Sequence, residues 1–330
     1  MSVSSRTPSR ILITGCTGFV GRYLIKQCRI HYPKATLFGL AGHSPSADNA
    51  LNTNDIQLTI VDITQPEAVH QLVAQSRPDI VFHLAAQSSV AASWHNPLET
   101  LTVNAGGTIH LLEAIRAEHL TPRIVLVGSG EQYGMVRPEE NPIREDCPLR
   151  PANPYAVSKA TQDLYGYQYF LAYHLPIMRT RSFNHFGPHQ AATFVIPNFA
   201  RQIALIEAGK AEPILLVGNL EARRDFLPVE DVIAAYLAIA DWGQPGAVYN
   251  IGSGQARSIR SILELLLSFS TTSIEVREDP GRLRPVDVPL LEADTSRLRT
   301  HTGWHPTIPF EDALRRTLDY WRNTFSSHTE

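Results

Sequence analysis

Short apolar segments alternate with helical patterns along the first half of this chain, and their order constrains the fold more than any other feature. The apolar segments, rich in Val, Ile and Leu, occupy residues 11–14, 37–40, 56–61, 80–84 and 124–127. Apolar residues at helical spacing fill residues 19–32, 67–76 and 98–119 between them. Strands that alternate with helices form a parallel sheet covered on both faces, because a parallel pair needs a crossover connection. The sequence therefore predicts an α/β fold with a doubly wound parallel sheet.

The second half of the chain is less regular, and proline and glycine become denser after residue 181. Helical patterns remain there, separated by short strand candidates, at residues 194–209, 229–241, 258–269 and 307–323. No repeat or low-complexity segment interrupts them. We expect a smaller C-terminal α/β lobe beside the sheet.

The composition excludes several classes of protein. The net charge of −3, from 29 Lys and Arg against 32 Asp and Glu, provides no basic surface for a nucleic acid. No apolar run reaches the roughly 20 residues that span a bilayer, and residues 1–10 lack the apolar segment of a secretory signal. The three cysteines, Cys16, Cys28 and Cys147, are odd in number and far apart, which favours a reducing compartment over a disulfide framework. We expect a cytoplasmic protein without nucleic-acid or membrane partners.

A glycine-rich loop, GCTGFVG, directly follows the first predicted strand and opens the first predicted helix. Glycines at this place permit a tight turn and let the backbone approach a pyrophosphate at the positive helix N-terminus. The alternative is a plain turn, because glycines are common after strands. The position between strand and helix favours a Rossmann-type dinucleotide site. Its expected contacts are Gly15, Thr17, Gly18, Phe19, Val20 and Gly21.

The end of the second strand bears on which dinucleotide binds. Residues 37–44 contain no carboxylate, and an Asp or Glu there would bind the ribose 2′-hydroxyl of NAD and repel a 2′-phosphate. This favours NADP(H) and leaves NAD(H) possible. No arginine is present to hold the phosphate, so His43 and Ser44 are candidates, and a site indifferent to the phosphate is the alternative.

The third and fourth strands end in residues that we also expect beside the cofactor. Asp62 and Ile63 follow the third strand, where the carboxylate can accept a hydrogen bond from the adenine amino group or belong to a helix N-cap region. The segment HLAAQS, residues 83–88, follows the fourth strand with small residues, as a loop close to a cofactor requires. We interpret His83 as a core histidine. The expected cofactor contacts in this segment are Leu84, Ala85, Ala86 and Gln87.

Tyr155 and Lys159 are four residues apart at the start of a helical run, and therefore lie on one face. An ammonium one turn from a phenol favours the phenolate and lowers the phenol pKa from its usual value of about 10. A tyrosine of this kind exchanges a proton with a hydroxyl or a ketone. The pair alone is common by chance, and its meaning depends on the other motifs.

Together these motifs resemble the extended short-chain dehydrogenase/reductase family, over about residues 10–321. Within it the chain is most similar to GDP-4-keto-6-deoxy-D-mannose reductases, which make GDP-D-rhamnose, with GDP-mannose 4,6-dehydratases as a sister group. The segments that carry this likeness are AQSSV at 86–90, GSGEQYGM at 128–135, SFNHFGP at 182–188, VGNLEARRDF at 217–226 and LRPVDVP at 283–289.

The resemblance implies a Rossmann domain with a nicotinamide cofactor and a C-terminal lobe that holds a GDP-sugar. We expect a disordered tail over residues 1–9 and a cofactor domain over 10–182, to which 226–252 returns. Residues 183–225 and 253–330 then form the nucleotide-sugar lobe. The family also implies a homodimer through the helices at about residues 98–119 and 155–174.

The resemblance assigns catalytic roles to residues near the fifth strand. A 4-ketoreductase uses Tyr155 as the acid, Lys159 to tune it and Ser129 to orient the ketone. A 4,6-dehydratase also needs a carboxylate that removes the C5 proton, and Glu131 occupies that position. Gly130 replaces the polar middle residue of the dehydratase pattern, so we favour the reductase. The dehydratase and another nucleotide-sugar epimerase or reductase remain the alternatives.

The resemblance also implies the substrate contacts. Two departures from the dehydratase pattern, Gln190 in place of arginine and Asn198 in place of lysine, weaken the assignment in that loop. His185 is expected beside the cofactor, and because Gly187-Pro188 separates it from His189 no metal site is expected. The implied substrate-binding residues are Ser88, Asn184, Val195, Arg224, Arg284 and Asp287.

Overall fold

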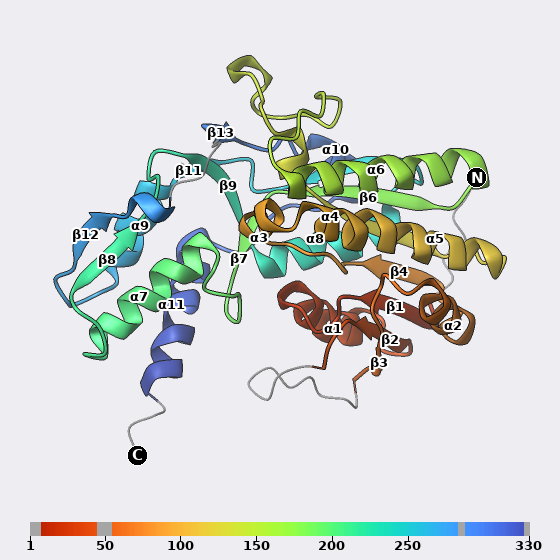
Figure 1. Ribbon diagram of the computed structural model, residues 1–330, viewed down its shortest axis with the longest axis horizontal. Coiled ribbons are helices and arrows are strands. Elements are labelled where there is room, and N and C mark those ends of the chain that lie inside the picture. Colours follow the sequence, from red (N-terminus) through yellow and green to blue (C-terminus); the bar gives the residue numbers. More distant parts are fainter. Residues whose placement is uncertain (1–7, 45–54, 283–287, 327–330) are drawn as a thin grey trace.

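The computed structural model describes residues 8–44, 55–282 and 288–326 (Figure 1). Its largest element is a seven-stranded sheet in the order β10-β6-β5-β4-β1-β2-β3, in which all neighbouring strands are parallel. The predicted doubly wound α/β fold is therefore confirmed. The strands are β1 (Arg10–Thr14), β2 (Thr36–Ala41), β3 (Gln57–Ile60), β4 (Ile80–His83), β5 (Arg123–Ser129), β6 (Ile177–Ser182) and β10 (Val248–Ile251).

Two apolar layers cover this sheet, because successive strand residues point to opposite faces. Ile11 and Ile13 of β1 pack in one cluster with the helices α1 (Phe19–His31) and α8 (Val229–Trp242). Leu12 belongs to the other cluster, which also contains residues of the remaining covering helices. These are α2 (Pro66–Ser76), α5 (Gly107–Ala117) and α6 (Pro154–Tyr173).

The helix predicted over residues 98–119 is not continuous. The structure has α4 (Pro97–Leu101), a π-helical turn η2 (Thr102–Gly106) and then α5. A π-helical turn adds a residue to the helix and commonly marks a functional position. Here it contains Asn104, which is fully buried and bonded to the loop after β4. The periodic pattern could not reveal this turn because apolar residues continue through it.

The remaining elements build a second, smaller part, whose helices and strands α7, α9, α11, β8 and β12 lie away from the large sheet in Figure 1. A four-stranded sheet has the order β11-β9-β13 with β7 also paired to β9, and β8 pairs with β12. The strands are β7 (Asn184–Phe186), β8 (Ile214–Val217), β9 (Arg223–Pro228), β11 (Ala256–Ser258), β12 (Glu275–Glu278) and β13 (Leu290–Leu291). The helices that share an apolar core there are α7 (Val195–Glu207), α9 (Ile259–Ser268) and α11 (Phe310–Ser326).

Short helices complete the described chain. They are α3 (Val90–His95), α10 (Ser296–Thr302), η3 (Gly130–Tyr133), η4 (Pro138–Glu140) and η5 (Pro280–Arg282).

Of the predicted tail, residues 1–7 lie outside the described residues, while the backbone N–H of Ser9 donates to Asp79. The chain returns to the large sheet at β10, which pairs with β6. The domain boundaries stay predictions. Among the described residues, no helix has the length and apolar character needed to cross a membrane.

Candidate active site

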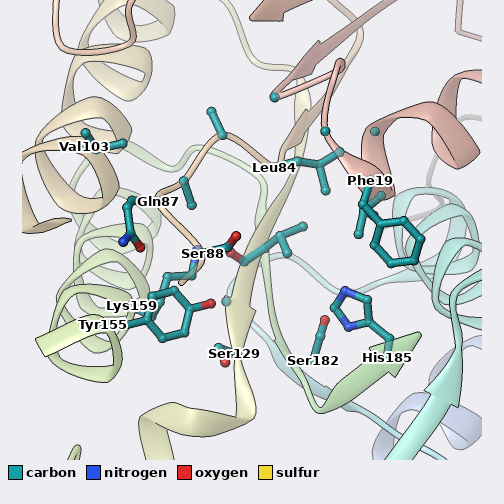
Figure 2. Close-up of a pocket in the computed structure, with 18 of the residues that line it drawn as sticks. Phe19, Leu84, Gln87, Ser88, Val103, Ser129, Tyr155, Lys159, Ser182 and His185 are labelled. Carbon is teal, nitrogen blue, oxygen red and sulfur yellow. The ribbon is translucent and has the colours of Figure 1, made fainter. Parts of the chain in front are cut away.

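A cavity of about 670 Å³ opens at the carboxyl ends of the central strands of the large sheet (Figure 2). β1 lies between β2 and β4. The chain runs from β1 to β2 and β3 on one side of the sheet and then crosses to β4 on the other side, so the strand order reverses at β1. Open α/β sheets bind ligands in the crevice at such a switch point. The lining residues come from the glycine loop, the ends of β2, β4, β5 and β6, and the start of α6.

The glycine loop has a conformation that side chains would prevent. Gly15 has φ of +69°, and a Cβ atom there would lie 2.8 Å from the backbone nitrogen of Ala85. A Cβ on Gly21 would lie 2.5 Å from the carbonyl oxygen of Gly15. Gly18 is the N-cap of α1, and no side chain of the described residues caps this helix end. The first turn of α1, all of whose residues are described, contains no acidic residue. The first backbone N–H groups of α1 are therefore available to an anionic group.

Two buried acceptors in the cavity lack a partner within the described part of the chain. They are Oε1 of Gln87 and Oε1 of Gln190, and both side chains line the cavity. Buried amide oxygens without partners are rare, so donor groups of a ligand are expected to satisfy them. Together with the glycine cradle, these atoms make the cavity fit a dinucleotide.

His83 holds the loop after β4 in place rather than facing a ligand. It is completely buried, with Nδ1 2.7 Å from Thr14 Oγ1 and Nε2 2.8 Å from Thr108 Oγ1. Burial, with a smaller effect of Lys159, lowers the pKa of His83 to about 3, so the ring is neutral. Thr14 Oγ1 accepts the backbone N–H of Ala85 at 3.1 Å. This links the ends of β1 and β4 and agrees with the interpretation of His83 as a core residue.

Asn104 is a site residue that the sequence did not reveal. Its Oδ1 accepts the backbone N–H of Gln87 at 2.7 Å, and its Nδ2 donates to the Gln87 carbonyl at 3.1 Å. The same Nδ2 donates to Ser158 Oγ, which itself donates to the carbonyl of Tyr155. Asn104 therefore fixes the loop after β4 relative to the start of α6. Only the packing of η2 against α6 brings these segments together.

Tyr155 lies in the first turn of α6, which begins after Asn153. Asn153 caps the helix through its Oδ1, which accepts the N–H of Ala156, and its Nδ2 donates to Glu131 at 3.2 Å. Tyr155 and Ser129 both lie at the cavity wall, and Figure 2 shows them beside Lys159. Burial raises the pKa of Tyr155 to about 12. Ser129 lowers this pKa and Glu131 raises it, and both effects are smaller than that of burial.

The structure does not show the lowered phenol pKa that the Tyr155–Lys159 spacing predicts. Lys159 Nζ donates to the carbonyl of Val127 at 2.6 Å and to the side chain of Gln162. Burial lowers the pKa of Lys159 to about 7, and Asp163 opposes this effect. In this arrangement Tyr155 is a neutral phenol, which is the form that donates a proton.

The cavity brings together most of the residues selected from the sequence. His185 is half-buried and lines it, with its ring stacked on Phe19 at a centroid distance of 6.2 Å (Figure 2). His43 also lines it, whereas Ser44 does not. The predicted residues at the cavity wall are Gly15, Thr17, Gly18, Phe19, Val20, Gly21, Asp62, Ile63, Leu84, Ala85, Ala86, Gln87, Ser88, Ser129, Glu131, Tyr155, Lys159, Asn184 and His185.

Two of the remaining implied substrate contacts, Val195 and Arg224, are described and do not line the cavity. Val195 opens α7, and Arg224 is a buried residue of β9 whose Nη1 donates to the carbonyl of Arg223. Arg284 and Asp287 lie outside the described residues. The expectation that these four residues hold the nucleotide therefore stays a prediction.

Several lining residues escaped the sequence interpretation. Ser182 and Phe183 lie at the end of β6, so the rule that ligands bind at strand ends could have found them. Tyr236 on α8 has no local signal, and it reaches the cavity because its hydroxyl lies 2.9 Å from Ser182 Oγ. Others are Gln190, Phe194 and Leu291.

Comparison with known proteins agrees with this geometry. Residues 12–317 match the family model described as GDP-mannose 4,6 dehydratase. The GDP-6-deoxy-D-mannose reductase of Pseudomonas aeruginosa is 35% identical over 314 residues, which are 95% of this chain and 97% of that protein.

Two solved structures have the same fold. RMD from Pseudomonas aeruginosa, complexed with NADPH, has a TM-score of 0.82 and 34% identity over 96% of this chain and 100% of that chain. The UDP-glucose 4-epimerase of Thermus thermophilus, complexed with NAD, has a TM-score of 0.84 and 28% identity over 95% and 99% of the two chains. The chain belongs to the GDP-mannose 4,6-dehydratase family of extended short-chain dehydrogenases/reductases.

Proposed function

We propose that the protein is an NAD(P)H-dependent 4-ketoreductase that converts GDP-4-keto-6-deoxy-D-mannose to GDP-D-rhamnose. The observation that carries the proposal is the placement of Tyr155 and Ser129 together at the cavity wall, beside Lys159. A neutral phenol beside a hydroxyl can hold a ketone oxygen and give it a proton. The 35% identity to a GDP-6-deoxy-D-mannose reductase supports this choice of substrate.

The glycine loop and the loops after β3 and β4 would hold the cofactor. The N-terminus of α1 would bind its pyrophosphate, Asp62 would accept a hydrogen bond from the adenine, and Gln87 would accept one through its unpartnered Oε1. The nicotinamide, when bound, supplies the hydride that reduces C4. NADPH is the preferred form, because the end of β2 carries no carboxylate and because the similar RMD was solved with NADPH.

The chain's own residues complete the reduction. Ser129 Oγ and the Tyr155 hydroxyl orient the C4 ketone, and the Tyr155 O–H bond breaks as the proton passes to the carbonyl oxygen. The product is an alcohol, and the phenolate left on Tyr155 recovers a proton from solvent. Protonated Lys159 stabilises that phenolate electrostatically from the same helix face.

The GDP moiety belongs to the side of the cavity that faces the smaller lobe. Asn184 and Ser88 line the cavity and would contact the substrate. Arg224 and Arg284 would neutralise the diphosphate, because the guanidinium fork matches phosphate oxygens. Val195 and Asp287 would contact the nucleoside.

A GDP-mannose 4,6-dehydratase is the second candidate, and Glu131 favours it. Its carboxylate lies at the cavity wall, accepts a hydrogen bond from Asn153, and could remove the C5 proton. The matching family model carries the dehydratase description. Nothing in the reductase mechanism requires this carboxylate.

One pair of assays separates the two functions. With GDP-4-keto-6-deoxymannose, a reductase consumes NADPH, which is followed as loss of absorbance at the nicotinamide band. With GDP-mannose and catalytic NADP, a dehydratase forms the 4-keto sugar without net cofactor use. Formation of that product, with no NADPH consumption in the first assay, would replace the proposed function by the second.

The proposed assembly is a homodimer. The long helix α6 leaves large apolar side chains exposed, with Leu164 60% and Leu171 55% accessible, and α4 leaves Leu98 74% accessible. Apolar side chains gathered on neighbouring helices are typical of a protein interface. The proposed compartment is the cytoplasm, and the three free cysteines support it. Sedimentation of the purified chain tests the dimer.

A further inference from the structure

A buried carboxylate on α6, Asp163, takes no part in the chemistry proposed above. It follows Lys159 by one helical turn and is only 3% exposed. Its Oδ1 accepts a hydrogen bond from Arg179 Nη1 at 2.6 Å. Its Oδ2 accepts from Arg181 Nε at 2.9 Å and from Gln132 Nε2 at 3.0 Å. A buried charge with this many partners is expensive to assemble, which raises the question of what it does.

One of these partners connects Asp163 to the proton donor. Gln132 is fully buried, and its Oε1 accepts the backbone N–H of Ser129 at 2.8 Å. The Ser129 side chain faces the phenol of Tyr155 at the cavity and lowers its pKa. A Cβ on Gly128 would lie 2.4 Å from Gln132 Oε1, so only glycine at that position leaves the amide in place. A continuous chain of contacts therefore runs from Asp163 to Tyr155.

Arg179 and Arg181 also donate hydrogen bonds to other groups, and these bonds hold the two guanidinium groups in place around the Asp163 carboxylate. Arg179 donates to the carbonyl of Gly246 at 2.9 Å. Arg181 donates to the hydroxyl of Tyr133 at 3.1 Å and to the carbonyl of Glu145 at 3.0 Å. The carboxylate is therefore held by groups from β6, η3 and the loops beside them.

The charges near Lys159 are unbalanced without Asp163. Burial raises the pKa of Asp163, but Arg181 and Arg179 lower it below its ordinary value, so the group is ionised at neutral pH. Burial lowers the pKa of Lys159, and the charge of Asp163 raises it. The other titratable and charged groups on the elements around Lys159 are Tyr155 on α6, His83 on β4, Glu131 after β5, and Arg179 and Arg181 on β6.

We propose that Asp163 is a positioning residue with two effects: through Gln132 it fixes the backbone of Ser129, and by its negative charge it keeps Lys159 protonated. Asp163 acts on the reaction only through these residues and does not touch the substrate. The first effect sets the geometry of proton transfer. The second sets the pH range in which the phenolate is stabilised. Both rest on the proposed function, since they concern its acid and its lysine.

The kinetic experiment compares the pH profiles of kcat and kcat/KM for the wild type, Asp163→Asn and Gln132→Leu. A neighbouring charge shifts a pKa by about one unit or more, so we expect the alkaline limb of Asp163→Asn to move down by about one pH unit. At pH 7.5 this lowers kcat about tenfold with KM for the sugar unchanged. Gln132→Leu should lower kcat without moving the limb, because the charge of Asp163 remains.

Two further variants serve as matched controls. Asp163→Glu keeps the charge and should restore the position of the limb. Asp231→Asn removes another buried carboxylate, which binds the backbone of Thr307 and Ile308, and should leave the profile unchanged. A limb shifted equally by Asp231→Asn, or unmoved by Asp163→Asn, would overturn the role of the charge. Wild-type kcat in Gln132→Leu would overturn the role of the amide.

A second measurement needs neither substrate nor cofactor. Because Lys159 has a lowered pKa in the folded protein, the free energy of unfolding should rise with pH from about 7 to about 10. In Asp163→Asn the rise should begin about one pH unit lower, and Lys159→Met should abolish it in both backgrounds. Equal onsets would overturn the proposal even if no turnover is found, so this failure is distinct from failure of the proposed function. If Asp163→Asn does not fold, Asp163→Ser takes its place in the test of the charge, because it also removes the carboxylate and keeps a polar side chain, and Gln132→Leu still tests the role of the amide.

Discussion

The two sides of the cavity recognise their ligands by different means. On the side of the proposed cofactor site, the recognising groups are backbone N–H groups, glycines and small residues within short loops that follow β1 and β4. On the side of the proposed substrate site, the expected groups are side chains from β7, β9 and α7, and the sheet that contains β7 and β9 is assembled from distant segments. A backbone site depends on local sequence, whereas a side-chain site depends on how the lobe packs.

Asp225 shows how the substrate side is held together. It is completely buried on β9, and its carboxylate accepts the backbone N–H groups of Ser253, Gly254 and Ala293 at 2.7, 2.9 and 3.2 Å. One side chain thus connects three segments of the lobe. The cofactor side uses the chain itself for the same purpose, with Gly15 N–H bonded to the carbonyl of Leu40 at 2.7 Å.

The largest expected effect lies where the two sides meet. Tyr155→Phe removes the proton donor and keeps the ring, so kcat should fall by roughly 10²- to 10⁴-fold. The dissociation constant of NADPH, measured by fluorescence, should stay within about threefold of the wild type. An unchanged kcat would exclude Tyr155 as the acid.

The next effect tests the cofactor side alone. Gly15→Ala forces a Cβ against Ala85 at a positive φ, which costs about 1–3 kcal/mol. If the glycine loop shifts to relieve this contact, NADPH should bind roughly 10- to 100-fold more weakly, as measured by titration. Gly42→Ala is the matched control, because a Cβ there meets no atom within 4 Å. Equal losses in both variants would contradict the proposed cradle.

A third substitution tests the substrate side alone. Asp225→Ala leaves three backbone donors, one buried and two part-buried, without their acceptor and should lower the free energy of unfolding by about 1–3 kcal/mol. KM for the GDP-sugar should rise while NADPH affinity is kept, since the cofactor loops are distant in the fold. Denaturant unfolding and the two binding constants measure this. Parallel loss of both affinities would show that the two sides are not independent.

The smallest effect distinguishes the two candidate functions. Glu131→Gln keeps the shape and the contact with Asn153, so ketoreductase kcat/KM should change by no more than about threefold, the scale of one exposed hydrogen bond. Dehydratase turnover of GDP-mannose would instead be lost with this carboxylate. Progress curves with each sugar, for wild type and variant, give the answer.

Much of the cofactor side could be predicted from the sequence because its signals are local. Each strand and helix is recognised from a short stretch of consecutive residues, and so is the loop from Gly15 to Gly21. The prediction of a continuous helix over residues 98–119 was wrong in one respect. The π-helical turn that contains Asn104 does not change the spacing of the apolar residues, so the sequence pattern does not reveal it. The pairing of Tyr155 with Lys159 also predicted a lowered phenol pKa, whereas burial raises the pKa of Tyr155.

The sequence by itself determined the α/β fold, the glycine loop and the positions of Tyr155 and Lys159, because each depends on short-range geometry. Only the tertiary structure decided that Asn104 reaches Gln87, that Tyr236 reaches the cavity, and that Asp163 connects through Gln132 to Ser129. These contacts join residues whose separation along the chain carries no pattern. They form because buried polar groups must find partners, and packing alone selects which ones.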